Sequence, residues 1–214
     1  MIPSTRARKI GIGIVVALAS AVLIAQPVAG KPAAQARTAI TCSWPVGPSD
    51  SAKDVLRRFG RQARMADIGV GEGETERGVV LFPNDPRRRI EVLCYGPTRH
   101  APQSVKFVSE RAPWTVAGIR LGDSLESVSR RNGRAMNMQM FGADYGGTVH
   151  SFNGGKLEKV MGACEPSIVF SPTAGTGDAN SLSGDGVVES DHPDMAKARP
   201  YVSILGVHFP APTD

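Results

Sequence analysis

A turn flanked by glycines presents an acid beside an aromatic residue in the second half of the chain. Asp144 and Tyr145 lie between Gly142 and the pair Gly146–Gly147. Tyrosine is enriched at the centres of protein interfaces, where its ring and hydroxyl both find partners. The segment therefore predicts a recognition loop for another protein. A bulged strand start, with Tyr145 closing the core, is the alternative interpretation.

A hydrolytic alternative would use two carboxylates. Asp144 and Glu158 are candidates for an envelope hydrolase acting on a glycan or a peptide, and glycoside chemistry needs two carboxyl groups roughly 5 to 10 Å apart. The sequence around these two acids gives no sign that they pair. No serine has a nucleophile-elbow sequence, and no two histidines have the spacing of metal ligands on a helix. The histidines are His100, His150, His192 and His208. We therefore expect no catalytic residue.

Two cofactor motifs are incomplete. Asp178, Asn180 and Glu189 fit the first, third and twelfth places of a calcium loop, but Ser183 stands where that loop needs glycine. The alternating glycines of residues 69–73 lack the lysine and hydroxyl residue of a nucleotide loop. We expect neither a metal ion nor another cofactor.

The same glycine-rich stretch also carries acidic residues. Glu72, Glu74 and Glu76 alternate along a predicted strand or turn. Acids in this arrangement could line a surface for a basic partner.

The first 36 residues have the layout of a secretory signal peptide. Arg6, Arg8 and Lys9 precede an apolar run over residues 10–24, and small residues suited to cleavage follow. An uncleaved anchor helix is the alternative, but we expect cleavage and no stable membrane insertion afterwards. The mature protein would be periplasmic or secreted.

Removal of this segment changes the charge. It takes away four positive residues and no negative one, so the net charge falls from +5 to +1. A basic surface is the main feature that would favour nucleic acid, so a nucleic-acid partner is not expected.

Export places three cysteines in an oxidising compartment, where one pair is expected to form a disulfide. In the predicted strand Arg89–Tyr95, Cys94 alternates with other apolar residues on one face and is expected to be buried as a free thiol. The predicted disulfide therefore joins Cys42 to Cys164.

An internal duplication organises the elements. Residues 50–60 and 123–133 share Asp, Ser, Val, Arg, Arg and Gly at the same places. Each segment predicts a short helix that ends at a glycine. The predicted N-terminal caps are Ser51 with Asp54 and Asp123 with Glu126.

The strands predicted from alternating patterns follow each helix. In the first half they are Gly78–Phe82, Arg89–Tyr95 and Ser104–Ser109, and in the second half Met136–Phe141, Gly147–Phe152, Leu157–Met161, Pro166–Ser171 and Tyr201–Phe209. Asn153–Gly154 is a strong hairpin signal. The predicted fold is α+β with two tandem repeats, over residues 40–112 and 113–209, each a short helix packed on an antiparallel β-meander. The second repeat carries a Gly/Ser/Asp-rich loop at 172–200.

Two further aromatic residues complete the predicted contacts. Trp114 lies at the start of the second repeat and Phe152 at the end of a predicted strand. Trp114 is expected mainly to pack between helix and sheet and also to offer a binding platform. Together with Asp144 and Tyr145, these residues form the predicted partner-binding set.

A loose family resemblance rests on these patterns. Gly118, Gly122, Val128 and Gly133 match the helix pattern of the small lipoproteins of the outer-membrane assembly machinery, and the doubled layout resembles the beta-lactamase inhibitory protein architecture. The segments 79–86, 114–133 and 144–157 resemble uncharacterised exported bacterial proteins that share VLFPNDP-like and DYGG-like segments.

The resemblance implies a scaffold that binds and does not catalyse. In the inhibitory protein an Asp and a Tyr on a hairpin of the first unit fill an enzyme pocket, whereas Asp144 and Tyr145 lie in the second unit, so that role is not transferred by position. We expect an exported binding protein of the bacterial cell envelope, inhibitor-like or an assembly module, whose partner is another envelope protein. A hydrolase and a purely structural envelope protein are the alternatives, and the sequence leaves the oligomeric state open.

Overall fold

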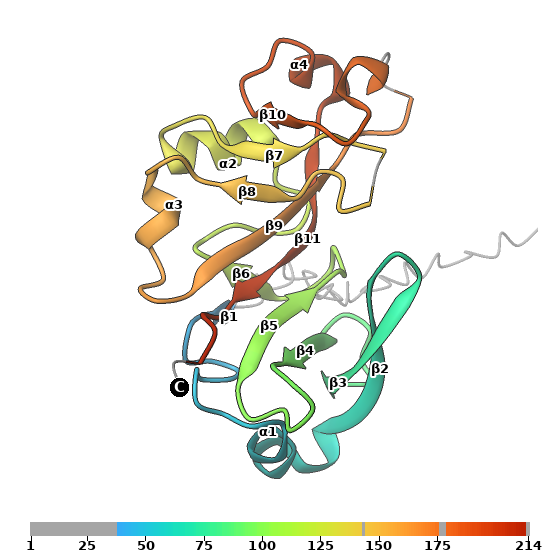
Figure 1. Ribbon diagram of the computed structural model, residues 1–214, viewed down its shortest axis with the longest axis vertical. Coiled ribbons are helices and arrows are strands. Elements are labelled where there is room, and N and C mark those ends of the chain that lie inside the picture. Colours follow the sequence, from blue (N-terminus) through green and yellow to red (C-terminus); the bar gives the residue numbers. More distant parts are fainter. Residues whose placement is uncertain (1–37, 143, 176–178, 213–214) are drawn as a thin grey trace, which may run out of the picture. The chain divides into compact units, whose positions relative to one another are not determined.

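The computed structural model describes residues 38–142, 144–175 and 179–212 of an α+β protein with few helices and mostly antiparallel sheets (Figure 1). The helices are α1 (Ala52–Phe59), α2 (Leu125–Asn132), α3 (Lys156–Lys159) and α4 (Met195–Ala198), with 3-10 turns at Gly60–Gln62 and Ala179–Leu182. The strands are β1 (Thr38–Ile40), β2 (Ala63–Gly71), β3 (Glu74–Leu81), β4 (Ile90–Cys94), β5 (Pro102–Phe107), β6 (Trp114–Val116), β7 (Asn137–Gln139), β8 (Val149–Ser151), β9 (Glu165–Ser171), β10 (Val187–Glu189) and β11 (Tyr201–His208).

The predicted signal peptide, residues 1–36, lies outside the described residues. Within the part that the structure describes, every helix is too short or too polar to cross a membrane.

The main sheet has six strands in the order β2-β3-β4-β5-β11-β9, and all neighbours are antiparallel. β10, β7 and β8 form a second sheet, and β1 pairs with β6 in parallel. β3, β4 and β5 follow one another as the predicted first meander, and β2, for which no strand was predicted, extends it. The second half differs from the prediction, because β11 lies between β5 and β9 and so joins the first meander instead of closing a separate sheet.

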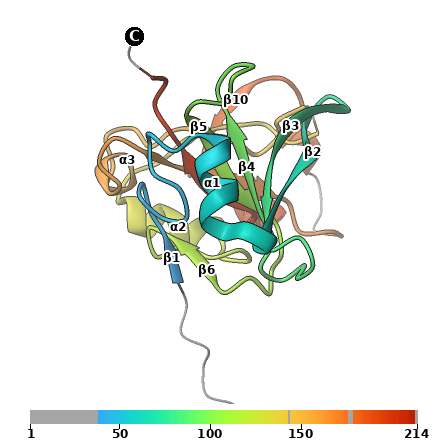
Figure 2. The same ribbon diagram turned by 90° about the horizontal axis from the view of Figure 1, so that it is seen from below.

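One hydrophobic core spans both halves of the chain. Val79, Val92, Val105 and Val207 stand in register across four strands, and each side chain is fully buried. α1 contacts β2 and β3, and Figure 2 shows it beside this part of the sheet. Val128 of α2 lies in the same core cluster as Val55 of α1, so the two helices share one apolar interior.

The two helices begin by similar means. Ser51 accepts a hydrogen bond from the amide of Asp54 while the Asp54 carboxylate accepts one from the amide of Ser51, which is the predicted capping box. α2 differs from the prediction because its cap is Ser124, whose hydroxyl accepts from Ser127. The Asp123 carboxylate accepts instead from the preceding turn.

The second half departs from the predicted strands at α3 and at β10. Asn153 and Gly154 have positive φ angles of 51° and 71° and form a turn, but the predicted hairpin is wrong because a helix follows this turn. The residues after this turn form α3, so the predicted strand Leu157–Met161 is wrong. Leu157 is buried, and a single turn of helix places it in the core as an alternating strand would. The predicted loop at 172–200 contains a 3-10 turn, β10 and α4.

Asn132 ties the second half together. Its buried side-chain amide donates to the carbonyl oxygens of Arg134 and Phe152 at 3.0 and 2.9 Å, and its oxygen accepts from the amide of Leu157 at 3.2 Å. A Cβ on Gly155 would lie only 2.1 Å from the Asn132 oxygen, so this glycine admits the asparagine. One polar side chain thus fixes the end of α2, the end of β8 and the start of α3.

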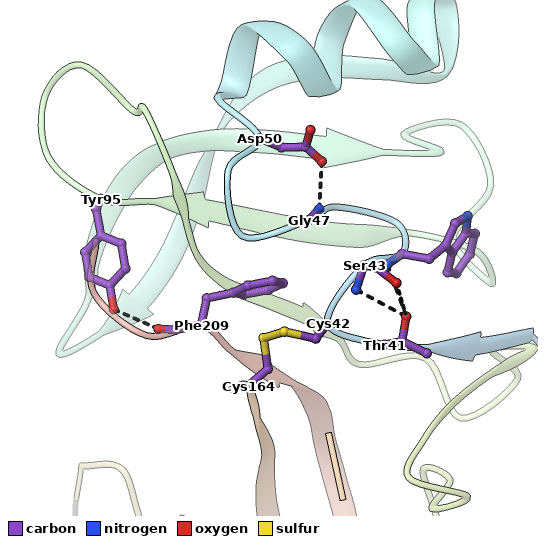
Figure 3. Close-up of a disulfide and its surroundings, with 9 residues drawn as sticks. Thr41, Cys42, Ser43, Gly47, Asp50, Tyr95, Cys164 and Phe209 are labelled. Carbon is purple, nitrogen blue, oxygen red and sulfur yellow. Dashed lines mark hydrogen bonds between the residues drawn. A yellow bond between two sulfur atoms is a disulfide. The ribbon is translucent and has the colours of Figure 1, made fainter. Parts of the chain in front are cut away.

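The predicted disulfide between Cys42 and Cys164 is confirmed (Figure 3). The two Cα atoms are 5.6 Å apart, and the cysteines are separated by 122 residues. Cys42 lies two residues after the end of β1, and Cys164 immediately precedes β9. The bond therefore fastens the end of β1 to the start of β9. Cys94 is a buried free thiol, as predicted.

Thiol counting checks this assignment. We expect no thiol of the native protein to react with an aromatic disulfide reagent, and one thiol, Cys94, to react after unfolding without reductant. Replacing both partners, Cys42→Ser with Cys164→Ser, should lower the free energy of unfolding by about 2–5 kcal/mol, because the long loop is no longer closed in the unfolded chain. Three reactive thiols in the unreduced, unfolded protein would contradict the disulfide.

The role of Asn132 can be measured by substitution. Asn132→Ala leaves a buried amide and two carbonyl groups without partners, and we expect the free energy of unfolding to fall by about 3 kcal/mol. Ser127→Ala on the same helix is the control and should change it by less than about 0.5 kcal/mol. Equal effects of the two substitutions in urea denaturation would show that the hydrogen bonds of Asn132 do not stabilise this half.

Candidate functional site

The candidate site is the outer face of the main sheet, opposite the shared core. Glu91, Lys106, Gly206 and Ser167 stand in register across β4, β5, β11 and β9. Side chains on this face are mostly short or polar and half-buried, in contrast to the apolar inner face. The other members of the outer face are Val80, Leu93, Ser104, Val169, Ile204 and His208.

The β2–β3 hairpin bends over one end of the outer face. Ile68 of β2 packs with Val80 and Leu93 in a small second cluster, in which each side chain is at least nine-tenths buried. Lys106 of β5 donates from Nζ to the carbonyl oxygen of Gly69 at 2.6 Å, although β5 and β2 are not adjacent in the sheet. The hairpin therefore forms a wall beside the outer face.

The loop with Asp144 and Tyr145 forms the opposite wall. Phe170 of β9 donates its amide to the carbonyl of Gly147 at 2.9 Å, and a Cβ on Gly147 would lie 1.9 Å from the Phe170 oxygen. Only glycine fits this close approach, and its φ of 78° also favours glycine. The loop is thus held directly on β9.

Tyr145 spans from this loop to the hairpin. Its φ angle is 61°, its side chain is 57% exposed, and its ring lies against Gly71, where an added Cβ would be 3.1 Å from the ring atoms. Gly71 itself has a φ of 120°, which L side chains rarely adopt. The exposed tyrosine therefore lies where two segments distant in the sequence meet.

The surroundings of Tyr145 are acidic. Asp144 is exposed, and the adjoining hairpin turn carries the exposed carboxylates Glu72, Glu74 and Glu76. Among the described residues no cation lies within ion-pair distance of these four acids, whereas Asp67 nearby pairs with Arg77 at 3.2 Å. Unpaired exposed carboxylates give this edge a negative potential.

The structure places the other two predicted contact residues in the core. Trp114 and Phe152 are 4% and 5% exposed. Trp114 stacks on Phe82 with ring centres 5.9 Å apart and donates from Nε1 to the carbonyl oxygen of Arg88 at 3.2 Å. Neither side chain is available to a partner in this structure, so the contact surface retains Asp144 and Tyr145.

The carboxylates of the hydrolytic alternative are not brought together. Asp144 lies in the loop that joins β7 to β8, and Glu158 lies on α3, which follows the other end of β8. The Glu158 carboxylate accepts a hydrogen bond from the amide of Gly154 and closes its own turn. These two acids therefore have separate positions at opposite ends of the β7–β8 hairpin.

Shifted pKa values occur away from the outer face. Hydrogen bonds from Arg58 hold the pKa of Asp50 below its usual range, and Asp50 also accepts from the amide of Gly47 (Figure 3). Burial raises the pKa of the Cys94 thiol. Hydrogen bonds from Ser51 lower the pKa of Asp54, and hydrogen bonds from Lys197 and Ser181 lower the pKa of Asp194. The hydrogen-bonded carboxylates of Asp50, Asp54 and Asp194 stabilise turns and helix ends.

The incomplete calcium loop and the histidines form no metal site among the residues that the structure describes. Asp178 of the incomplete calcium loop lies outside the described residues, and the structure gathers no three His, Cys, Asp or Glu side chains around a metal position in the ranges it covers. His150 is exposed on β8, and its Nε2 lies 3.1 Å from Oε1 of Gln139.

No family model, no curated protein and no solved structure matches this chain.

The contact between Tyr145 and Gly71 could not be deduced from the sequence. Both residues lie in glycine-rich segments, but neither segment contains a feature that predicts a contact with the other. The signal that could have found it is co-variation between the two positions in homologous sequences.

A ring contact of this kind is measurable in solution. Tyr145→Ala should shift the amide resonance of Gly71 strongly, because it removes the ring current, and leave Val207 in β11 nearly unchanged. Tyr95→Phe, which keeps the ring and removes only the hydroxyl that donates to the carbonyl oxygen of Phe209, is the control. An unmoved Gly71 resonance in the Tyr145→Ala spectrum would contradict the contact.

Proposed function

We propose that this protein is an exported, non-catalytic binding protein of the bacterial cell envelope, and that it grips another envelope protein with the outer face. The observation that carries the proposal is Tyr145, exposed and held against Gly71 between the two walls of that face. An aromatic residue fixed in this way loses little entropy on binding and supplies a large contact area.

The charge of the walls indicates the kind of partner. Asp144 and the acids of residues 72–76 have no cation close by among the residues described. A partner with a basic patch would complement them, which favours fast association that weakens with salt.

Two features support export. The N-terminal 36 residues have the pattern of a signal peptide, and the Cys42–Cys164 disulfide is typical of proteins in oxidising compartments. We propose a periplasmic or secreted location on these grounds.

We also propose that the chain arose by doubling of one helix-plus-meander unit. α1 and α2 are both eight residues long and start 73 positions apart, in the same register as the sequence duplication. The sheet order is compatible with two four-stranded meanders, β2 to β5 and β7, β8, β9 and β11, since Thr148 beside β8 bridges to Val169 of β9. In this arrangement the last strand of each unit, β5 and β11, pair with one another.

Partner capture tests the binding surface. Tagged protein with Asp144→Ala and Tyr145→Ala should recover a specific envelope partner at least tenfold less well than wild type, and 0.5 M salt should also reduce recovery. Glu110→Gln with Val160→Ala is the matched control, since it removes one exposed acid after β5 and one exposed apolar side chain just after α3. Equal recovery of every partner by wild type and the Asp144/Tyr145 variant would overturn the proposed surface.

A further inference from the structure

A second concavity lies along α2, away from the outer face. The segment Ser190–Pro200 runs beside this helix and is fastened at both ends. At one end the Ser190 hydroxyl accepts from the amide of Met136 at 2.9 Å, and at the other the carbonyl of Pro200 accepts from the amide of Leu125 at 2.9 Å. Between these attachments the chain bulges from the helix and leaves a groove of about 880 Å³. None of its lining residues belongs to the outer face.

The groove has an apolar floor. Leu125 and Met195, both 4% exposed, line it together with Ala135, Ala196 and Pro193. The volume falls within the range of ligand-binding clefts, roughly 300–1,000 Å³. α2 has eight residues, so the groove beside it is about 12 Å long.

An arginine stands near each end of the groove. Arg134 follows the end of α2, and Arg199 precedes Pro200, which is bonded to the start of α2. Both side chains are exposed, and neither has a carboxylate partner among the described residues. One guanidinium nitrogen of Arg134 donates to the carbonyl oxygen of Asn153 at 3.3 Å, and its other N–H groups remain for a ligand. Two hydrogen bonds hold the backbone of Arg199 in place. Its amide donates to the carbonyl oxygen of Met195, and its own carbonyl oxygen accepts from the Thr173 hydroxyl at 2.7 Å.

The other charged side chains along the groove are either paired with one another or negative. Arg130 is paired with Glu126 on the exposed surface of α2, so this pair contributes little net charge. Asp191 is exposed near the Arg134 end and would repel an anion there, and His192 beside it lies 4.0 Å from Asp194. The guanidinium groups at the two ends, which form no ion pair with a carboxylate among the described residues, therefore set the preference of the groove for negative charge.

The duplicate helix shows that the groove is particular to α2. Leu56 and Phe59 of α1 pack against the core, whereas the matching positions of α2 are Ser129 and Asn132. Asn132 turns toward the core and is bonded there, while Ser129 lines the groove and bonds to Ser190 at 3.4 Å. Without a large apolar side chain at the position of Ser129, the concavity stays open.

We propose that this groove binds an extended peptide segment of a partner protein, with acidic side chains four residues apart and an apolar side chain midway between them. In an extended chain, residues i, i+2 and i+4 point to one side, and i to i+4 spans about 13 Å. This spacing matches the length of about 12 Å along α2, near whose ends the two arginines lie. Each guanidinium can hold a carboxylate through two hydrogen bonds, and the central side chain contacts Leu125 and Met195.

Binding of a synthetic peptide tests the proposal on the disulfide-bonded mature protein. The probe is acetyl-Glu-Thr-Leu-Thr-Glu-amide, measured by calorimetry and by amide shifts of the groove residues. Control peptides carry Lys in place of both Glu, or Ser in place of Leu. We expect no binding of the Lys peptide and about tenfold weaker binding of the Ser peptide, because the apolar contact is lost.

Variants locate the binding. Arg134→Gln and Arg199→Gln should each weaken the peptide about tenfold, and Asp191→Asn should strengthen it, because the opposing charge is removed. Arg61→Gln with Arg64→Gln removes two exposed charges elsewhere and should leave the affinity unchanged. Ala196→Trp fills the exposed side of the groove without changing charge and should abolish the shifts.

Three results would overturn the proposal: equal affinity for the Glu and Lys peptides, unchanged affinity in both groove arginine variants, or amide shifts confined to residues outside the groove. Each readout is independent of the outer face, so partner capture through Tyr145 can succeed or fail separately.

Discussion

The position of β11 is the constraint on which the rest of the structure depends. This strand comes last in the chain, yet it pairs with β5 on one side and with β9 on the other. Its Leu205 and Val207 are fully buried on the inner face. Until β11 is inserted, β5 and β9 each have an edge of unpaired backbone groups, whose burial would be costly. The two halves of the chain therefore complete one another.

The same constraint builds the outer face. β5, β11 and β9 supply its middle, the hairpin of the first half one wall, and the loop with Tyr145 the other. A surface made from segments this far apart is stable only when the whole unit is folded. The Cys42–Cys164 disulfide acts in the same direction, since it joins the first strand to the start of β9 and limits the separation of the halves in the unfolded chain.

Local patterns were not sufficient for either half, since they missed β2 in the first and α3 and β10 in the second. The helix 52–59, its capping box and the strands near β3, β4 and β5 depend on neighbours in sequence, and apolar periodicity with turn residues indicated them. α3 could not be predicted in this way. Its start is fixed by Asn132, and a buried asparagine 25 residues away leaves no mark on the periodicity of residues 157–161. The disulfide was predictable because alternation identified Cys94 as the buried thiol. The contact of Tyr145 with Gly71 depends on tertiary assembly, so sequence reasoning found the exposed tyrosine but not its neighbour.

The differences between α1 and α2 explain how one helical pattern can have two roles. In α1, Leu56 and Phe59 add apolar contacts, and the helix is held by packing against β2 and β3. α2 has Ser129 and Asn132 at the corresponding positions, and Asn132 stabilises this helix end through hydrogen bonds. Such bonds are directional, so they fix the backbone at specific points and need not fill the space beside the helix.

The acidic walls of the outer face and the arginine-bearing groove have opposite charge. A basic partner that complements one surface would be repelled by the other, so the two proposed surfaces select different segments and do not compete for the same one.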